Sequence, residues 1–111
     1  MFDYFSELDS AVTICDAEGI IVYMNQKAES TFGKWGGRAL IGKSLFHCHN
    51  EQSGQIIRQI LASGQPNTYT IEKQGQKKLI HQAPWKHEGK IAGLIEISIV
   101  LPADMPHKIR G

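Results

Sequence analysis

The sequence predicts an α+β fold with five strands, and three observations lead to this prediction. Two β-rich runs stand near the start of the chain, at 11–16 and 20–24. Three more close it, at 68–73, 76–86 and 91–101, with connections short enough for an antiparallel meander. Between the two groups lies a stretch with helical periodicity and glycine breaks.

The start of the chain carries apolar side chains at helical spacing. Phe2, Phe5 and Leu8 are separated mainly by polar residues, which predicts a short amphipathic helix over 2–8. A helix of this length is marginal in water by itself, so we expect it to dock on the rest of the chain or on another chain.

The connection between the two early strands has the chemistry of a turn. Asp16 can accept hydrogen bonds from the turn backbone, and Gly19 can adopt the positive φ that such turns often need. Asn25 is a candidate N-cap for a helix over 26–32, because its side-chain oxygen can accept from the free N–H groups there. Three glycines then predict a flexible connection over 33–40.

The longer helix is marked at both ends. Asn50 can cap its start, and Glu51 complements its dipole. Gly64 can end it in a left-handed conformation, and the following proline prevents its resumption. The apolar stripe between them consists of Ile56, Ile57, Ile60 and Leu61.

The three closing strands are joined by two turns, at Gln74–Gly75 and His87–Gly89. Pro84 cannot donate a hydrogen bond, so we expect an edge or a bulge near it. The last strand carries Ile95, Ile97, Ile99 and Leu101 on one face and Leu94 and Val100 on the other. A strand that is apolar on both faces needs cover on both sides.

Three segments resemble the PAS sensor domain family: Asp16–Ala28, Ile41–Ser44 and Gly93–Ile99. The strongest part is Asp16-x-x-Gly19 followed by Asn25-x-x-Ala28, at the separation that the family shows. The resemblance covers about residues 8–101. It implies a PAS-like five-stranded antiparallel sheet with helices packed on one face. The implied divisions are an N-terminal amphipathic cap helix over 1–9, the PAS domain over 10–101 and a C-terminal tail over 102–111.

PAS domains hold ligands between the sheet and the helical segment. The resemblance therefore implies a pocket lined from the 35–61 region and from the inner faces of the last three strands. The candidate lining residues are Trp35, Phe46, His49, Ile57, Leu61 and Trp85. The same apolar side chains could instead fill a small core, and this simpler interpretation is the one that the residues alone favour.

Composition narrows the class of protein. The 111 residues fit one domain, and a formal net charge of +1 attracts neither nucleic acid nor an anionic membrane. No apolar run is long enough to span a bilayer, and the start lacks the features of a signal peptide. Two cysteines and no export signal predict a protein of the reduced cytoplasm, and the absence of a CxxC pair leaves a thiol-redox role without support.

One motif suggests nucleotide chemistry. Gly37–Ser44 satisfies the G-x-x-x-x-G-K-S pattern, in which backbone N–H groups, Lys43 and Ser44 would hold phosphates and magnesium. The motif should leave a buried parallel strand, but the residues before it predict a capped helix and a glycine connection. We therefore expect no nucleotide hydrolysis.

A second cluster, His47-Cys48-His49, suggests metal chemistry. Imidazole and thiolate bind metals, and histidine is an axial haem ligand. Some PAS domains bind haem through a histidine in this region, so a haem or metal sensor using His49 or His47 is an alternative. Flavin-binding relatives carry a reactive cysteine in Asn-Cys-Arg-Phe-Leu-Gln, and Cys48 has none of the Arg-Phe-Leu-Gln that should follow it, which argues against flavin. No cofactor is required by the sequence.

Glu96 interrupts the apolar pattern of the last strand. Its carboxylate is either solvent-facing or buried with a partner. We expect it to face outward. The alternative is that it faces the cleft beside His81 or Gln82 and orients a polar ligand.

Together these features predict a non-catalytic signal-transduction domain that binds a small ligand or a protein partner. We expect a homodimer that passes its signal to a downstream protein, without nucleic-acid or membrane contacts. A pure dimerisation module with a filled core is a further alternative.

Overall fold

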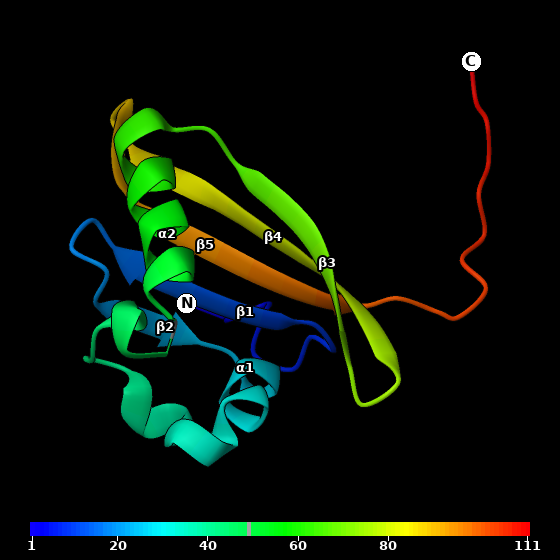
Figure 1. Cartoon of the computed structure of the whole chain (residues 1–111). Coiled ribbons are helices and arrows are strands. Elements are labelled where there is room, and N and C mark those ends of the chain that lie inside the picture. Colours follow the sequence, from blue (N-terminus) through cyan, green and yellow to red (C-terminus); the bar gives the residue numbers. More distant parts are fainter. Residues whose placement is uncertain (49) are drawn as a thin grey trace.

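The computed structural model describes residues 1–48 and 50–111. Its strands form one antiparallel sheet in the order β2-β1-β5-β4-β3 (Figure 1). The strands are β1 Ala11–Asp16, β2 Ile21–Met24, β3 Asn67–Lys73, β4 Gln76–His87 and β5 Lys90–Val100. The α+β fold predicted from the sequence is therefore confirmed.

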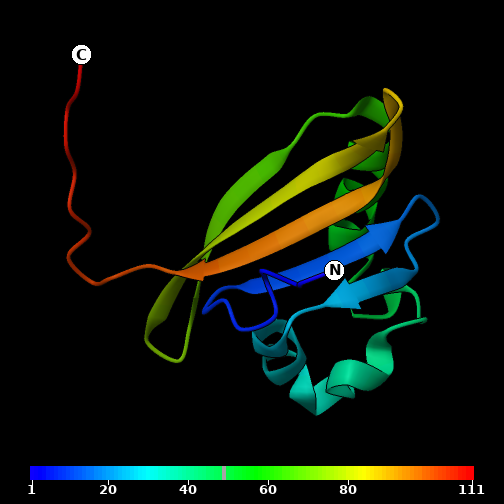
Figure 2. The same ribbon diagram turned by 180° about the vertical axis from the view of Figure 1, so that it is seen from behind.

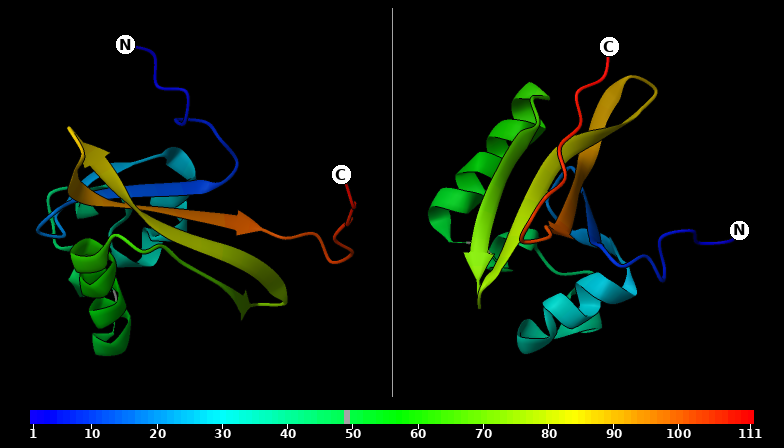
Figure 3. Two further views of the ribbon diagram at one scale, coloured as in Figure 1. Left: turned by 90° about the horizontal axis from the view of Figure 1, so that it is seen from above. Right: turned by 90° about the vertical axis from the view of Figure 1, so that its right-hand side faces the viewer.

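The helical segment follows β2 and covers one face of the sheet, which we call the inner face (Figure 1). It comprises α1 Gln26–Thr31, η1 Gly33–Trp35, η2 Gly37–Leu40, η3 Leu45–Cys48 and α2 Glu51–Ser63, the three η elements being 3₁₀ helices. The N-terminal segment lies on the opposite, outer side (Figures 2 and 3). Among the described residues, no helix is long and apolar enough to cross a membrane.

The core lies between the helices and the inner face. Ile57 and Ile60 of α2 pack into one buried cluster with Cys15 of β1 and Leu94 of β5. Ala28 is completely buried, and its small side chain lets α1 lie close to the sheet. The burial of these groups supplies the main stabilisation of a domain of this size.

Local signals in the sequence are confirmed at several turns and caps. Asp16 Oδ1 accepts from the N–H groups of Glu18 and Ile20, at 2.9 and 3.0 Å. Gly64 ends α2 with a φ of 79°, and its N–H reaches the carbonyl of Ile60. Gln74 and Gly75 both have positive φ, as a two-residue hairpin turn requires.

Pro84 lies in the part of β4 that no longer pairs with β3. The pairing of β3 with β4 ends at Asn67 and Gln82, so the residues of β4 beyond that point pair with β5 alone. A register shift follows between Trp85 and Lys86. The edge and the bulge expected near this proline are thus both present.

The helix predicted over 2–8 is wrong. Residues 4–7 form turns, with the hydrogen bonds Ser6 N–H to Asp3 O and Leu8 N–H to Phe5 O. Two carbonyl groups of this segment accept hydrogen bonds from residues distant in sequence. Asn25 Nδ2 donates to Phe5 O, and the N–H of Gln26 donates to Ser6 O. These long-range bonds satisfy the backbone in place of a helical ladder.

Candidate ligand-binding site

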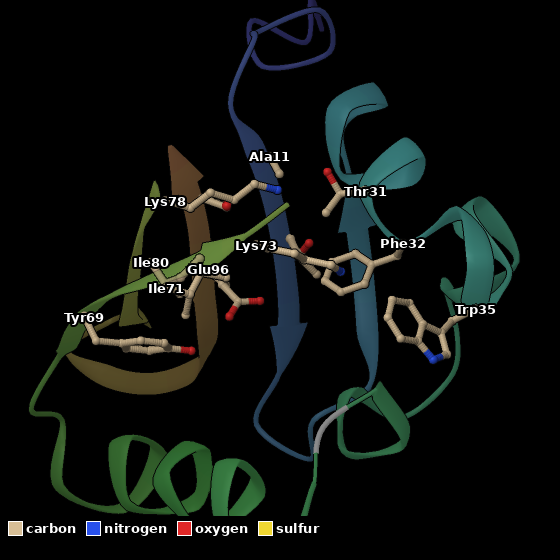
Figure 4. Close-up of a pocket in the computed structure, with 12 residues that line it drawn as sticks. Ala11, Thr31, Phe32, Trp35, Tyr69, Ile71, Lys73, Lys78, Ile80 and Glu96 are labelled. Carbon is tan, nitrogen blue, oxygen red and sulfur yellow. The ribbon is translucent and has the colours of Figure 1, made fainter. Parts of the chain in front are cut away.

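A cavity of about 190 Å³ lies on the inner face, between the α1–η1 segment and strands β3, β4 and β5 (Figure 4). Its apolar lining consists of Ala11, Phe32, Trp35, Tyr69, Ile71 and Ile80. Its polar lining consists of Thr13, Thr31, Lys73, Lys78, Glu96 and Ser98. A mostly apolar hollow with a few polar groups is the usual composition of a small-molecule site.

Strand alternation places the lining residues. Every second residue of a strand points to the same face, so Tyr69, Ile71 and Lys73 of β3 all reach the cavity. The antiparallel register sets Tyr69 opposite Ile80, and Ile80 opposite Ser98. The three closing strands therefore present one continuous wall of the cavity.

Glu96 on the central strand β5 is the buried charge of this wall, with an exposed fraction of 9%. Gln82, opposite it on β4, donates from Nε2 to Glu96 Oε1 at 3.0 Å. Asn67 on β3 in turn donates from Nδ2 to Gln82 Oε1 at 3.1 Å. The expectation that Glu96 faces outward is therefore wrong, because the side chain lies on the cavity side, beside Gln82.

The direction of this chain of hydrogen bonds is fixed by the carboxylate. An ionised carboxylate only accepts, so Gln82 must turn its amide nitrogen toward Glu96 and its oxygen toward Asn67. Asn67 must then offer its own nitrogen. The ionised carboxylate of Glu96 thus sets the orientation of two further side chains on two neighbouring strands.

A second cavity of about 260 Å³ lies next to the first, beside the start of α2. It is lined by Gln52, Ser53, Ile56, Asn67, Tyr69 and Gln82. Tyr69 lines both cavities. The two amides in the hydrogen-bond chain from Glu96 thus line the second cavity, which places them between the carboxylate and α2.

Burial raises the pKa of the Tyr69 phenol, and the nearby Glu96 carboxylate raises it further. Tyr69 is therefore neutral at physiological pH and keeps its O–H as a donor. The two lysines of the cavity are less enclosed than Glu96, since Lys73 is exposed and Lys78 half-buried. The Lys73 ammonium lies 5.7 Å from the centroid of the Trp35 ring.

Of the candidate lining residues that the structure describes, the cavity includes Trp35 and none of the others. Phe46 packs beside Gly19 and Gly54, and the guanidinium of Arg58 lies 4.1 Å from its ring centroid. Ile57 belongs to the core, and Leu61 packs against it. His49 lies outside the described residues, as do the side chains of His47 and Cys48.

Trp85 lies on the outer face. It pairs with Gly93, which points away from the core because the next residue, Leu94, points into it. The indole N–H of Trp85 donates to the carbonyl of Cys15 at 2.9 Å. Residues that sequence reasoning missed are Phe32, Tyr69, Ile71 and Ile80. The alternation of Tyr69 and Ile71 with polar neighbours marked a half-buried strand, but it did not say which face held a cavity.

The segment Gly37–Ser44 has no geometry for holding phosphates. It consists of η2 and a turn that pairs with β2. The N–H of Gly42 donates to Ile21 O at 2.8 Å, and that of Lys43 donates to Leu40 O at 2.9 Å. The backbone donors that a phosphate would need are thus engaged within the chain. Among the described residues, no group of three or more His, Cys, Asp or Glu side chains is placed to hold a metal.

A family model described as the PAS fold matches residues 5–101, most of the chain. The chain belongs to the PAS family. The match includes all five strands and the helical segment between them, and the resemblance noted in the sequence is confirmed.

Solved structures of similar fold include other PAS domains. The PAS domain of histidine kinase ThkA has a TM-score of 0.68 and 21% identity, over 81% of this chain and 97% of that one. VqmA bound to DPO has a TM-score of 0.72 and 21% identity, over 89% of this chain and 55% of that one. The Vibrio cholerae Aer2 receptor, described as a dual PAS-haem oxygen sensor, has a TM-score of 0.64 and 19% identity, over 84% of this chain and 95% of that one. No curated protein sequence matches this PAS domain significantly.

Proposed function

We propose that this PAS domain is a sensor that binds a small molecule in the cavity on its inner face and catalyses no reaction. The observation that carries this proposal is the placement of Glu96. A buried carboxylate is costly, and an apolar side chain of similar size would stabilise a filled core better. A charge kept in the wall of a cavity, and oriented by two amides, is what a polar ligand needs.

Ligand binding becomes a signal through the elements beside the cavity. Asn67 begins β3, the element that follows α2 after a short connection, and it is the far end of the hydrogen-bond chain from Glu96. A ligand that engages the carboxylate therefore also acts on the junction between α2 and β3. It shifts the population of two packing states by its difference in affinity for them. A downstream signalling protein in the cytoplasm would read that shift.

Two structural neighbours support this proposal through the molecules that they are described as binding. VqmA is described as bound to DPO, and the Aer2 receptor is described as a haem sensor. Haem bound through His49 or His47 remains an alternative for this chain.

We also propose that the domain forms a homodimer through its outer face. The strand register places five apolar side chains on this face: Ile14, Leu79, Ile95, Ile97 and Ile99. In Figure 2 this face of the sheet is turned to the viewer, and α2 lies behind it. The N-terminal segment lies on the same side of the sheet (Figure 3), and its Phe2 and Tyr4 are 73% and 80% exposed. A second copy could cover both in an isologous interface.

Native mass spectrometry of the purified protein tests the sensor proposal. We expect wild type to carry a small-molecule mass that the cavity-filling variant Ser98→Phe lacks, because Ser98 faces the cavity. The matched control is Ile99→Phe, which adds an aromatic ring on the outer face of the same strand. Equal retention by both variants would contradict binding in this cavity.

A further inference from the structure

We propose that the ligand of this cavity is a small amphipathic anion, with an apolar ring that packs among the aromatic side chains and a carboxylate that Lys73 and Lys78 bind. This inference deepens the proposed sensor function and rests on it. It concerns the charge and the size of the ligand, which the fold of the family leaves open.

Lys73 and Lys78 lie next to each other, toward the β3–β4 turn. In the register of these two strands, Lys73 pairs with Gln76 and Lys78 pairs with Ile71. The two lysines are therefore diagonal neighbours on one face of the sheet, with Cβ atoms about 7 Å apart. Both line the cavity, and Figure 4 shows both side chains extended toward its middle. Two long side chains at this spacing can bind one carboxylate together.

Neither lysine forms an ion pair with an acidic side chain in the part of the chain that the structure describes. A third ammonium group lies at the same end of the cavity, since that of Lys34 is 4.8 Å from the centroid of the Trp35 ring. The ammonium of Lys73 is 5.7 Å from the same centroid. Positive charge of this kind around the opening of a hollow attracts an anion and raises its local concentration.

Glu96 does not make the cavity a site for cations, because its carboxylate is already engaged within the protein by Gln82. Gln82 and Glu96 are opposite each other on β4 and β5, whereas Lys78 lies four residues before Gln82. At about 3.4 Å per residue, this spacing is about 13 Å along the strand. The anionic group of the ligand therefore lies nearer to the two lysines, and the uncharged end of the ligand faces Glu96.

The rest of the lining suits an apolar ring. The rings of Phe32 and Trp35 have centroids 6.3 Å apart, and Ile71 and Ile80 line the cavity from the sheet. The volume of about 190 Å³ equals that of about six water molecules in the liquid, which admits one ring with a short side chain. Because Lys73 is exposed, the charged end of such a ligand keeps part of its hydration while the ring is buried.

Three probes with one carbon skeleton test the inference: hydrocinnamate, the corresponding alcohol and the corresponding ammonium, which are anionic, neutral and cationic. The chain has two tryptophans, so its two indole N–H signals in a nitrogen-correlated NMR spectrum form a matched pair. Trp35 lines the cavity, and Trp85 lies on the other face. Movement of the Trp35 signal at constant Trp85 signal reports binding in the cavity and yields a dissociation constant for each probe.

We expect hydrocinnamate to bind about fivefold or more tightly than the alcohol, and the ammonium to bind most weakly, because two partly exposed lysines favour the anion. The double variant Lys73→Gln, Lys78→Gln removes both charges and should abolish this preference. The matched control is the double variant Lys77→Gln, Lys86→Gln. It changes the net charge equally at exposed positions outside the cavity lining, so it should keep the preference.

Each other result has a distinct meaning. Tightest binding of the ammonium, or equal binding of the three probes, would overturn the preference for an anion. A preference that persists without Lys73 and Lys78 would overturn the role of these two side chains. A Trp35 signal that no probe moves would overturn this inference, whereas the sensor function would fail only if wild type and Ser98→Phe carried the same bound mass or none.

Discussion

Asn25 shows how one side chain can hold three parts of a fold. Its Oδ1 accepts from the N–H groups of Val12 and Ala28, each at 3.0 Å. Its Nδ2 donates to the carbonyls of Phe5 and Ser10, at 2.9 and 2.8 Å. The capping bond to Ala28 was predictable from sequence because it is local, whereas the other three bonds depend on chain segments that only the fold brings together.

Replacement of Asn25 by alanine should therefore cost far more than the loss of an ordinary cap. We expect the free energy of unfolding to fall by about 3–5 kcal/mol, because four bonds are lost and buried backbone groups are left without partners. Asn50→Ala removes the exposed cap of α2 and should cost about 1 kcal/mol. Urea unfolding of both variants measures the difference, and equal losses would contradict this account of Asn25.

Tyr23 ties the N-terminal segment to the sheet, since its hydroxyl donates to Asp3 Oδ2 at 2.6 Å. Desolvation and this hydrogen bond raise the pKa of Tyr23 from 10.0 to about 12. Because the folded pKa lies above the unfolded one, the stability from this contact is fully present below pH 10.0 and is lost as the pH rises through about 12. An ultraviolet titration of tyrosinate should lose its highest step in Tyr23→Phe. Retention of that step would assign it to another tyrosine.

Gly93 is required by the packing of Trp85. A Cβ at this position would overlap the carbonyl oxygen of Cys15 and the indole nitrogen of Trp85. We expect Gly93→Ala to lower the free energy of unfolding by about 3 kcal/mol, because the backbone carbonyl of Cys15 cannot move away from the added methyl group. Gly33→Ala meets open space and should change it by less than about 0.5 kcal/mol. Thermal unfolding distinguishes the two, and an unchanged Gly93→Ala protein would refute the close approach.

At the scale of elements, the sequence predicted what local patterns determine. The strands, α2 and the hairpin turns follow from alternation, from caps and from glycines with positive φ. The segment over 2–8 was mistaken for a helix because its competing partners, Asn25 and Gln26, are distant in sequence.

The candidate site was predicted less well, and β5 shows the reason. Both of its faces were expected to need cover, the one with Ile95, Ile97 and Ile99 and the opposite one, and Glu96 was placed outward. In the structure the isoleucine face is the outer one, and the face with Glu96 and Ser98 lines the cavity. Alternation fixes which residues share a face, but only the placement of the helices decides which face is inner.

The reversed hydrophobicity of β5 leads to a prediction about assembly. A charge at Ile99, 38% exposed on the outer face, should weaken the proposed dimer. We expect Ile99→Glu to raise the dimer dissociation constant by at least about tenfold, measured by light scattering after size-exclusion chromatography. Ile109→Glu, in the exposed tail, is the control and should not alter it. A monomeric wild type would contradict the dimer directly.

At the scale of the whole molecule, the two proposed surfaces lie on opposite sides of the same strands. The cavity occupies the inner face of β3, β4 and β5, and the apolar surface occupies the outer face of β1, β4 and β5. A shift in strand positions on one side therefore acts on the other side without a separate relay. This arrangement suits a domain that converts ligand occupancy into a change of protein contacts.

Isoleucine methyl groups allow the central claim, binding on the inner face, to be tested most directly. Ile71 and Ile80 point into the cavity, and Ile97 and Ile99 lie on the outer face of the neighbouring strand. In carbon-correlated NMR spectra recorded with and without the small molecule that native mass spectrometry identifies, we predict that the methyl signals of Ile71 and Ile80 move further than those of Ile97 and Ile99. Movement of the outer pair alone, or of neither pair, would contradict the account.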